Sequence, residues 1–237
     1  MMGEKAFFIN EKLCIACGSC RTACKLWNNL PKEAEPDQPH KFTVSLWSRV
    51  NYFEEGSAYH EKCRHCYDAK CVASCPENAL FYQDGFVVIN KDKCIACGKC
   101  ETVCPFACVK VGNLPGESKK TAHKCHACVI EADSKPHCVL NCPTGALIFG
   151  NRRRIISKAL KLRSEYSSKG EEYVIEGISG DFQMGAITLK KKRDEKKLSL
   201  SSSAGNEKFI YSLVLRSVPV LRPVRRHIYD FISKMLS

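Results

Sequence analysis

The sequence lacks an apolar run long enough to cross a membrane and lacks a secretory signal before its first cysteine. Its last apolar segment, residues 209–221, has thirteen residues and contains Arg216 and Pro219, whereas a spanning helix needs about 20 apolar residues. We therefore expect no transmembrane span of its own, and membrane association only through partners. Without a signal, we expect the chain in the cytoplasm, or in the periplasm after export in the folded state with a signal-bearing partner.

Acidic residues are fewer than basic residues: the chain has 25 Asp and Glu and 37 Lys and Arg, which gives a formal net charge of +12. The imbalance is local, because residues 1–150 carry 18 basic against 16 acidic residues and residues 151–237 carry 19 against 9. Basicity alone would suggest nucleic acid, but no motif that combines aromatic and basic residues accompanies it. We therefore expect no nucleic-acid partner.

Cysteine, in contrast, is abundant, and sixteen of the seventeen cysteines fall into four groups of four. The first and third groups have the spacing C-x2-C-x2-C-x3-C, whereas the second and fourth have a wider middle gap. A proline follows the last cysteine of every group except the first, where Lys25 stands instead. The four groups are Cys14, Cys17, Cys20 and Cys24; Cys63, Cys66, Cys71 and Cys75; Cys94, Cys97, Cys100 and Cys104; and Cys125, Cys128, Cys138 and Cys142.

This spacing is the one by which bacterial-type ferredoxins bind 4Fe-4S clusters. Three close thiolates can cap three irons of one cubane if the backbone curls around it, which small residues such as Ala96 and Gly98 permit. The fourth cysteine cannot reach the same cubane and is expected to bind a neighbouring cluster. We expect four 4Fe-4S clusters, each contributing about −2 with its thiolates, which lowers the formal charge of +12 to about +4.

Two other uses of cysteine must be weighed. Disulfides are typical of small secreted chains, and this chain is too long to need them. Paired C-x-x-C units also form structural zinc sites, but four cysteines within eleven residues, with proline after the last, favour cubanes. A zinc-stabilised binding scaffold is the alternative of a different class.

Around the cysteine groups the pattern indicates short elements and an internal duplication, with an apolar strand before the first group and another before the third. Beyond Gly150 the cysteines stop. We expect strands at 6–9, 42–50, 51–53, 85–89 and 173–178, a helix at 155–168, a basic amphipathic helix at 222–236, a loop at 33–40 and a polar linker at 190–208.

A few residues near the groups are expected to have structural roles. Cys108 lies outside every group, and we interpret it as a small buried apolar residue. Trp27 and Trp47 are expected in the core or an interface. Four histidines are expected to pack or hydrogen-bond rather than bind iron: His65, His123, His126 and His137. The cations expected near the clusters, where they would influence reduction potentials, are Arg64, Lys70, Lys99 and Lys124.

The order and spacing of the four groups resemble the four-cluster iron-sulfur subunit of molybdenum and tungsten bis-pterin oxidoreductases, the dimethyl sulfoxide reductase-like family. The segments FFINEKLCIACGSCRTACKLWNNLP, EKCRHC and CPTGALIFG most resemble the beta subunit of formate dehydrogenases. The resemblance covers residues 5–150. It implies an α+β fold with two bacterial-ferredoxin-like units of two clusters each (residues 1–150), followed by a basic C-terminal helical or irregular extension for partner docking (residues 151–237). The membrane helix that often ends such subunits is missing here.

Carried over residue by residue, the resemblance also implies which cysteines share a cluster, with the last cysteine exchanged between groups. The implied sets are Cys14, Cys17, Cys20 and Cys142; Cys125, Cys128, Cys138 and Cys24; Cys94, Cys97, Cys100 and Cys75; and Cys63, Cys66, Cys71 and Cys104.

The resemblance implies a non-catalytic electron-transfer subunit that relays single electrons to or from a molybdenum or tungsten pterin subunit, with formate dehydrogenase as the first expectation. The second partner would be a quinone-reactive or cytochrome membrane subunit, a hydrogenase or a soluble carrier. The alternatives within redox chemistry are the same role in a sulfur-compound or other reductase, and a free-standing polyferredoxin. The basic extension argues against the latter.

Overall fold

The computed structural model describes residues 5–31, 41–53, 56–129, 135–178 and 183–193. Residues 1–192 form one compact unit. The expected loop at 33–40, most of the expected linker, and the expected helix at 222–236 lie outside the described residues. Within the described part of the chain, no helix combines the length and apolar character needed to cross a bilayer.

A four-stranded mixed sheet organises this unit, with strand order β8-β1-β10-β9. β1 is antiparallel to β8, parallel to β10, and β10 is antiparallel to β9. The strands span β1 Lys5–Asn10, β8 Leu147–Asn151, β9 Tyr173–Glu176 and β10 Ala186–Lys191. The expected strands at 6–9 and 173–178 are confirmed, whereas β10 lies in a segment for which the sequence predicted no strand.

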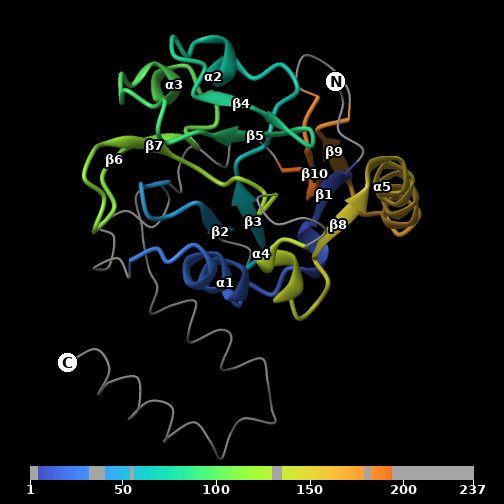
Figure 1. Ribbon diagram of the computed structural model, residues 1–237. Coiled ribbons are helices and arrows are strands. Elements are labelled where there is room, and N and C mark those ends of the chain that lie inside the picture. Colours follow the sequence, from blue (N-terminus) through green and yellow to red (C-terminus); the bar gives the residue numbers. More distant parts are fainter. Residues whose placement is uncertain (1–4, 32–40, 54–55, 130–134, 179–182, 194–237) are drawn as a thin grey trace, which may run out of the picture. The chain divides into compact units, whose positions relative to one another are not determined.

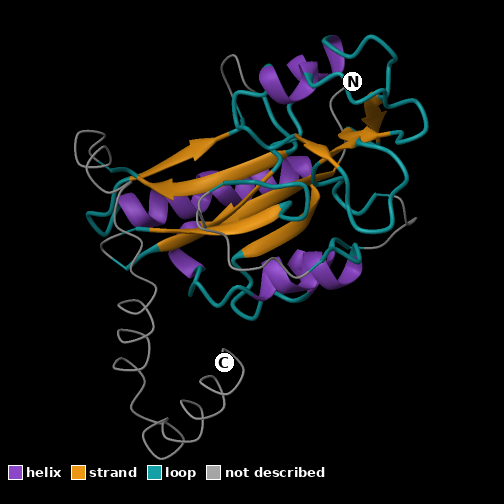
Figure 2. Ribbon diagram, turned by 90° about the vertical axis from the view of Figure 1, so that its left-hand side faces the viewer, coloured by secondary structure: helices purple, strands orange, loops and turns teal. Residues whose placement is uncertain are grey.

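Both faces of β1 are buried, because its side chains alternate between two cores. Phe7 and Ile9 belong to a core that also contains cysteines of the first and fourth groups. Ala6 and Phe8 face the opposite core, which helix α5 (Arg152–Ser167) covers. Figures 1 and 2 show α5 lying along one face of this sheet. The sheet therefore separates the cysteine-bearing side from the helix.

Helix α5 matches the helix expected at 155–168. It begins where the Asn151 side chain accepts a hydrogen bond from the Arg154 N–H (3.2 Å). It ends before Gly170, whose φ of 76° suits the residue that follows a helix. Its first residue, Arg152, is buried and donates to the carbonyls of Met184 (2.5 Å) and Gly177 (3.2 Å). The helix is thereby fastened to the β9–β10 connection.

The remaining strands form three antiparallel hairpins, of which β5 confirms the strand expected at 85–89. The four-residue helices α2 and α3 pack together, as do α1 and α4. Figure 1 shows these two helix pairs at opposite ends of the unit. These elements span β2 Ser48–Tyr52, β3 Ala58–Lys62, β4 Leu80–Gln83, β5 Phe86–Ile89, β6 Lys110–Gly112, β7 Thr121–His123, η1 Glu11–Leu13, α1 Ser19–Trp27, α2 Lys70–Ala73, α3 Lys99–Thr102 and α4 His137–Leu140.

The compact unit extends to Lys192, which differs from the boundary expected after Gly150. Backbone hydrogen bonds explain the difference: Gly185 N–H donates to the His65 carbonyl (2.9 Å) and Ala186 N–H to the Arg64 carbonyl (3.1 Å). The segment that leads into β10 therefore pairs with the loop between Cys63 and Cys66. The described residues 151–178 and 183–192, which we expected to belong to an extension, are part of the fold that positions the cysteines.

Candidate iron-sulfur sites

The four C-x-x-C loops share one backbone feature. The residue before the second cysteine has a positive φ in all four loops: Ala16 (60°), His65 (49°), Ala96 (55°) and Ala127 (60°). This left-handed conformation reverses the chain between the two cysteines and turns both toward the same hollow. Sequence analysis anticipated a small residue at Ala96, but not a histidine in this strained position.

The glycine after the second cysteine has a related role in the first and third groups. Gly18 (φ 73°) and Gly98 (φ 78°) are the N-cap residues of α1 and α3. A residue with a β-carbon is strained in that region. The turn places Cys20 and Cys100 on the helix that follows, so that three cysteines of a group surround one space.

Three hollows in the structure are each lined by four cysteines. In each case, three cysteines come from one group and the fourth from another. The four lining cysteines are Cys14, Cys17, Cys20 and Cys142 in hollow 1; Cys75, Cys94, Cys97 and Cys100 in hollow 2; and Cys24, Cys125, Cys128 and Cys138 in hollow 3.

The remaining four grouped cysteines also lie close together. Burial raises the pKa of Cys66 to about 11, and the neighbouring Cys63 and Cys104 thiols raise it further. Burial likewise raises the pKa of Cys71 to about 12, with Cys63, Cys104 and Cys66 contributing. These mutual effects require short separations. The structure therefore brings together all four sets that the resemblance implies.

Burial also governs the thiols of the other sets. It raises the pKa of Cys20 to about 12 and that of Cys100 to about 11, and it raises the pKa of Cys24 strongly. Without a bound metal these thiols are protonated at neutral pH. Because iron binds thiolates, metal binding must release these protons and supply the free energy that offsets their burial.

Backbone N–H groups point at several of the sulfurs, as expected around a cluster. Ala122 donates to Cys94 Sγ (3.3 Å), Ala79 to Cys75 Sγ (3.3 Å) and Ala127 to Cys125 Sγ (3.4 Å). Within the described residues, no three His, Cys, Asp or Glu side chains converge closely enough to hold a single metal ion. A cubane differs from such an ion in needing thiolates spread around a cavity.

His126 links the fourth group to the first through Asn28. Its Nδ1 accepts the Cys128 N–H (3.2 Å), which assigns the proton to Nε2, and Nε2 then donates to Asn28 Oδ1 (2.6 Å). The Asn28 amide donates in turn to the Cys24 carbonyl (2.8 Å) and Cys24 Sγ (3.6 Å). Burial, followed by the nearby charge of Lys124, lowers the pKa of His126 to about 4. The neutral His126 imidazole therefore holds the Asn28 amide in the position from which it donates to Cys24 Sγ.

The other three histidines also pack or hydrogen-bond, as expected. His123 contacts Thr121 Oγ1 (3.1 Å) and the Gly112 carbonyl (3.1 Å), and His65 packs edge-on against Phe86. His137 stacks on Trp27, with ring centroids 3.6 Å apart. Trp47 is buried as predicted, whereas Trp27 is 43% exposed.

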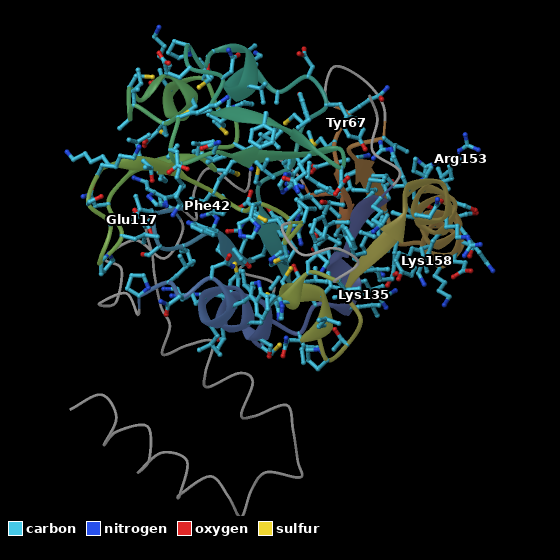
Figure 3. The ribbon with its side chains drawn as sticks, in the orientation of Figure 1. Phe42, Tyr67, Glu117, Lys135, Arg153 and Lys158 are labelled. Carbon is cyan, nitrogen blue, oxygen red and sulfur yellow. The ribbon has the colours of Figure 1, made fainter. Side chains whose placement is uncertain are left out.

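Cys108 is buried, as predicted, in a small core with Phe42, Cys63, Cys104 and Cys125. Figure 3 labels Phe42 of this core. The Cys108 thiol donates a hydrogen bond to the Phe106 carbonyl (3.3 Å), and the adjacent Cys108 side chain, with nearby backbone N–H groups, lowers the pKa of Cys104 to about 5. Cys108 lines none of the three hollows. Sequence reasoning identified its burial but not its contact with a grouped cysteine.

We expect Cys108→Ser to keep its full iron content and nearly normal electron transfer. Serine has a similar size and still carries a donor for Cys104, and the four cysteine sets are complete without Cys108. Iron analysis of the purified variant checks this expectation. A loss of about four irons per chain, one cluster's content, would show that Cys108 is a ligand.

Of the four cations that the sequence suggested, Arg64 and Lys124 are buried near grouped cysteines, whereas the other two are not. Lys70 and Lys99 are exposed, and buried Arg64 binds Thr188 Oγ1 (2.7 Å) and faces Glu176 (3.5 Å). Lys124 is buried and donates to the carbonyls of Val87 and Cys125. Lys62, which the sequence analysis missed, lines hollow 3 and has no hydrogen-bond partner for its Nζ. An orphaned buried ammonium beside four cysteines fits a bound anionic cluster.

Comparisons with known proteins agree with this geometry. A family model described as a 4Fe-4S dicluster domain matches residues 56–152, and a 4Fe-4S binding domain model matches residues 11–27. The iron-sulfur subunit of the nitrate-inducible formate dehydrogenase of Escherichia coli is 30% identical over 203 residues, covering 76% of this chain and 67% of that protein. The B subunit of the anaerobic dimethyl sulfoxide reductase of Escherichia coli is 32% identical over 157 residues, covering 63% and 75%.

A third relative, the formate dehydrogenase iron-sulfur subunit of Haemophilus influenzae, is 29% identical over 204 residues, covering 76% of this chain and 64% of that protein. The matches confirm the expected family, the 4Fe-4S cofactors and the role in electron transfer. The chain belongs to the family of 4Fe-4S electron-transfer subunits that includes the iron-sulfur subunits of formate dehydrogenases and dimethyl sulfoxide reductase.

Proposed function

We propose that this chain relays single electrons to or from a molybdenum or tungsten bis-pterin catalytic subunit that acts on formate. The bound 4Fe-4S clusters would supply reversible one-electron storage. The observation that carries the electron-transfer role is that each hollow draws three cysteines from one group and one from another. The proposed ligand sets are Cys14, Cys17, Cys20 and Cys142; Cys24, Cys125, Cys128 and Cys138; Cys75, Cys94, Cys97 and Cys100; and Cys63, Cys66, Cys71 and Cys104.

The proposal includes two ferredoxin-like units. One buried core contains cysteines of the first and fourth groups together with Phe7 and Ile9. A second core contains cysteines of the second and third groups together with Leu80 and Val87. Packing of α1 on α4, and of α2 on α3, supports the same division. Each unit would thus be held together by its own core and by its exchanged cysteines.

The exposure and contacts of the cysteines also support one order in which the four proposed cluster sites would follow one another. Cys17 and Cys97 are exposed, which makes their sets the two that meet solvent or partners. Cys63 and Cys125 share the core around Cys108, so their sets are neighbours in the interior. Burial, followed by the nearby thiols of the Cys125 set and by Cys20, raises the pKa of Cys24, which supports a position of the Cys17 set beside the Cys125 set. We propose entry and exit at the Cys17 and Cys97 ends.

Formate is the favoured substrate of the catalytic partner because the formate dehydrogenase subunits match 76% of this chain. A sulfoxide reductase is the second candidate, since its B subunit is 32% identical over a shorter stretch of 157 residues. The second partner would be a quinone-reactive or cytochrome membrane subunit, a hydrogenase or a soluble carrier. We propose partner docking for the segment after Arg193, which carries eight basic and four acidic residues.

The test is anaerobic purification of the native complex, with mass spectrometry of the large subunit and analysis for molybdenum and tungsten. The proposal expects a pterin-containing partner and formate-dependent reduction of a viologen dye. Sulfoxide-dependent oxidation of reduced viologen, without formate activity, would favour the second candidate. A chain that elutes alone with its clusters in size-exclusion chromatography would be a free-standing polyferredoxin and would refute the partnership.

A further inference from the structure

Lys62 carries a buried ammonium group for which the described residues provide no hydrogen-bond acceptor or anion. It is the last residue of β3 and is only 1% exposed. Its Nζ has no hydrogen-bond partner, and its contact is the Phe7 ring, whose centroid lies 3.1 Å away. A buried ammonium without an anion or hydrogen-bond acceptor is strongly unfavourable. A cation–π contact offsets only part of this cost.

The negative charge that would neutralise the Lys62 ammonium would lie in hollow 3. Lys62 lines hollow 3 together with Cys24, Cys125, Cys128 and Cys138. The acidic neighbour in the sequence, Glu61, is engaged by Arg49 and Asn51 instead. Four thiolates and their cluster would place net negative charge in front of the Lys62 ammonium.

The other two hollows have no such cation among their described lining residues. Hollow 1 is lined by His60, which is buried and hydrogen-bonds with Ser48 Oγ (2.7 Å), and by no lysine or arginine. Hollow 2 is lined by Glu77, a carboxylate. Among the three hollows, a lysine therefore lines hollow 3 and neither of the other two.

We propose that Lys62 is the built-in counter-charge of the 4Fe-4S cluster held by Cys24, Cys125, Cys128 and Cys138, and that it raises the reduction potential of that cluster selectively. This inference rests on the ligand sets proposed above. One-electron reduction adds one negative charge to the cluster, and the fixed ammonium stabilises this charge more than that of the oxidised state. Because the site is buried, solvent screens the interaction little.

The experiment compares Lys62→Met, Lys62→Gln and Lys62→Arg in the full-length holoprotein, by redox titration monitored with electron paramagnetic resonance. We expect both neutral variants to keep their iron and to shift the potential of the cluster in hollow 3 to a more negative value, with smaller shifts of the other clusters. Lys62→Arg, which keeps the charge, should stay near the wild-type potential. Lys158→Met is the matched control, because Lys158 is exposed on α5, on the far side of the sheet (Figure 3).

Two results would overturn the proposal: neutral variants with full iron and unchanged potentials, or an Arg variant shifted as far as the Met variant, which would indicate packing rather than charge. If Lys62→Met loses iron, the reduction potentials of Lys62→Gln and Lys62→Arg are compared instead, with the same criteria. The ligand sets are tested separately by the iron content of cysteine variants. An unshifted Lys62→Gln with normal iron would therefore refute the role of Lys62 without affecting the proposed function.

Discussion

A chain truncated after Gly150 is expected to lose its fold and most of its iron, whereas a chain truncated after Arg193 is expected to keep both. The reason is β10, which lies between β1 and β9 in the sheet. Removing it would leave β1 with an unpaired edge. It would also remove the backbone partners of Arg64 and His65, in the loop between two grouped cysteines.

The energetic cost supports a large effect. Truncation after Gly150 removes Ile155, Ile187 and Leu189 from the core shared with Phe8. Each such side chain contributes about 1.5–3 kcal/mol when fully buried. Their sum is comparable to the total stability of about 5–15 kcal/mol that is typical of a domain. Metal binding stabilises the truncated chain only if the cysteine loops keep their positions.

The measurement is soluble yield and iron per chain for the two truncated proteins, expressed and purified anaerobically in parallel. The chain that ends at Arg193 is the matched control, because it has lost residues but keeps the whole sheet. An iron content in the Gly150 truncation equal to that of the full chain would show that residues 151–192 are dispensable. The boundary first expected from the sequence would then be correct.

Variants of two cysteines that come from different groups but line the same hollow should lose the same cluster signal. We expect Cys142→Ser to lose the same cluster signal as Cys14→Ser, because both residues line hollow 1. We expect Cys24→Ser to lose the same signal as Cys125→Ser, because both line hollow 3. Each variant should lose about four irons, or convert its cluster to a form with fewer irons, since a ligand is gone.

Electron paramagnetic resonance spectra of the reduced variants measure this pairing, and Cys108→Ser is the control that should lose nothing. If the ligands followed the groups along the chain, Cys142→Ser would instead resemble Cys125→Ser. That result would contradict the exchange of fourth cysteines on which the two proposed units depend.

The cysteine spacing predicted the cofactor, and the apolar runs predicted β1, β5, β9 and α5, because these signals are local. The sequence did not predict β10. Its segment AITLKK leads into a run of lysines that suggested a linker, and its burial follows from pairing with β1 and from the hydrogen bond between Thr188 and Arg64. Such pairing joins residues far apart in the chain, and no local pattern encodes it.

The charges near the sites were predicted only in part, since Arg64 and Lys124 are buried near grouped cysteines as expected. Lys70 and Lys99 adjoin cysteines in sequence yet are exposed, whereas Lys62 precedes Cys63 at the end of a strand and is buried. Proximity to a cysteine in sequence does not determine the side of a strand or helix on which a side chain lies. Likewise, Cys108 could be predicted to be buried because it lies outside every cysteine group, but its hydrogen bond to the Phe106 carbonyl and its contact with Cys104 required the fold.

The central claim is that four cysteine sets hold four 4Fe-4S clusters. Its most direct test is the iron, acid-labile sulfide and zinc content of the anaerobically purified full-length protein. Four clusters predict about sixteen irons and about sixteen sulfides per chain, with little zinc. Stoichiometric zinc with little iron and sulfide would contradict the claim and favour a zinc-stabilised scaffold.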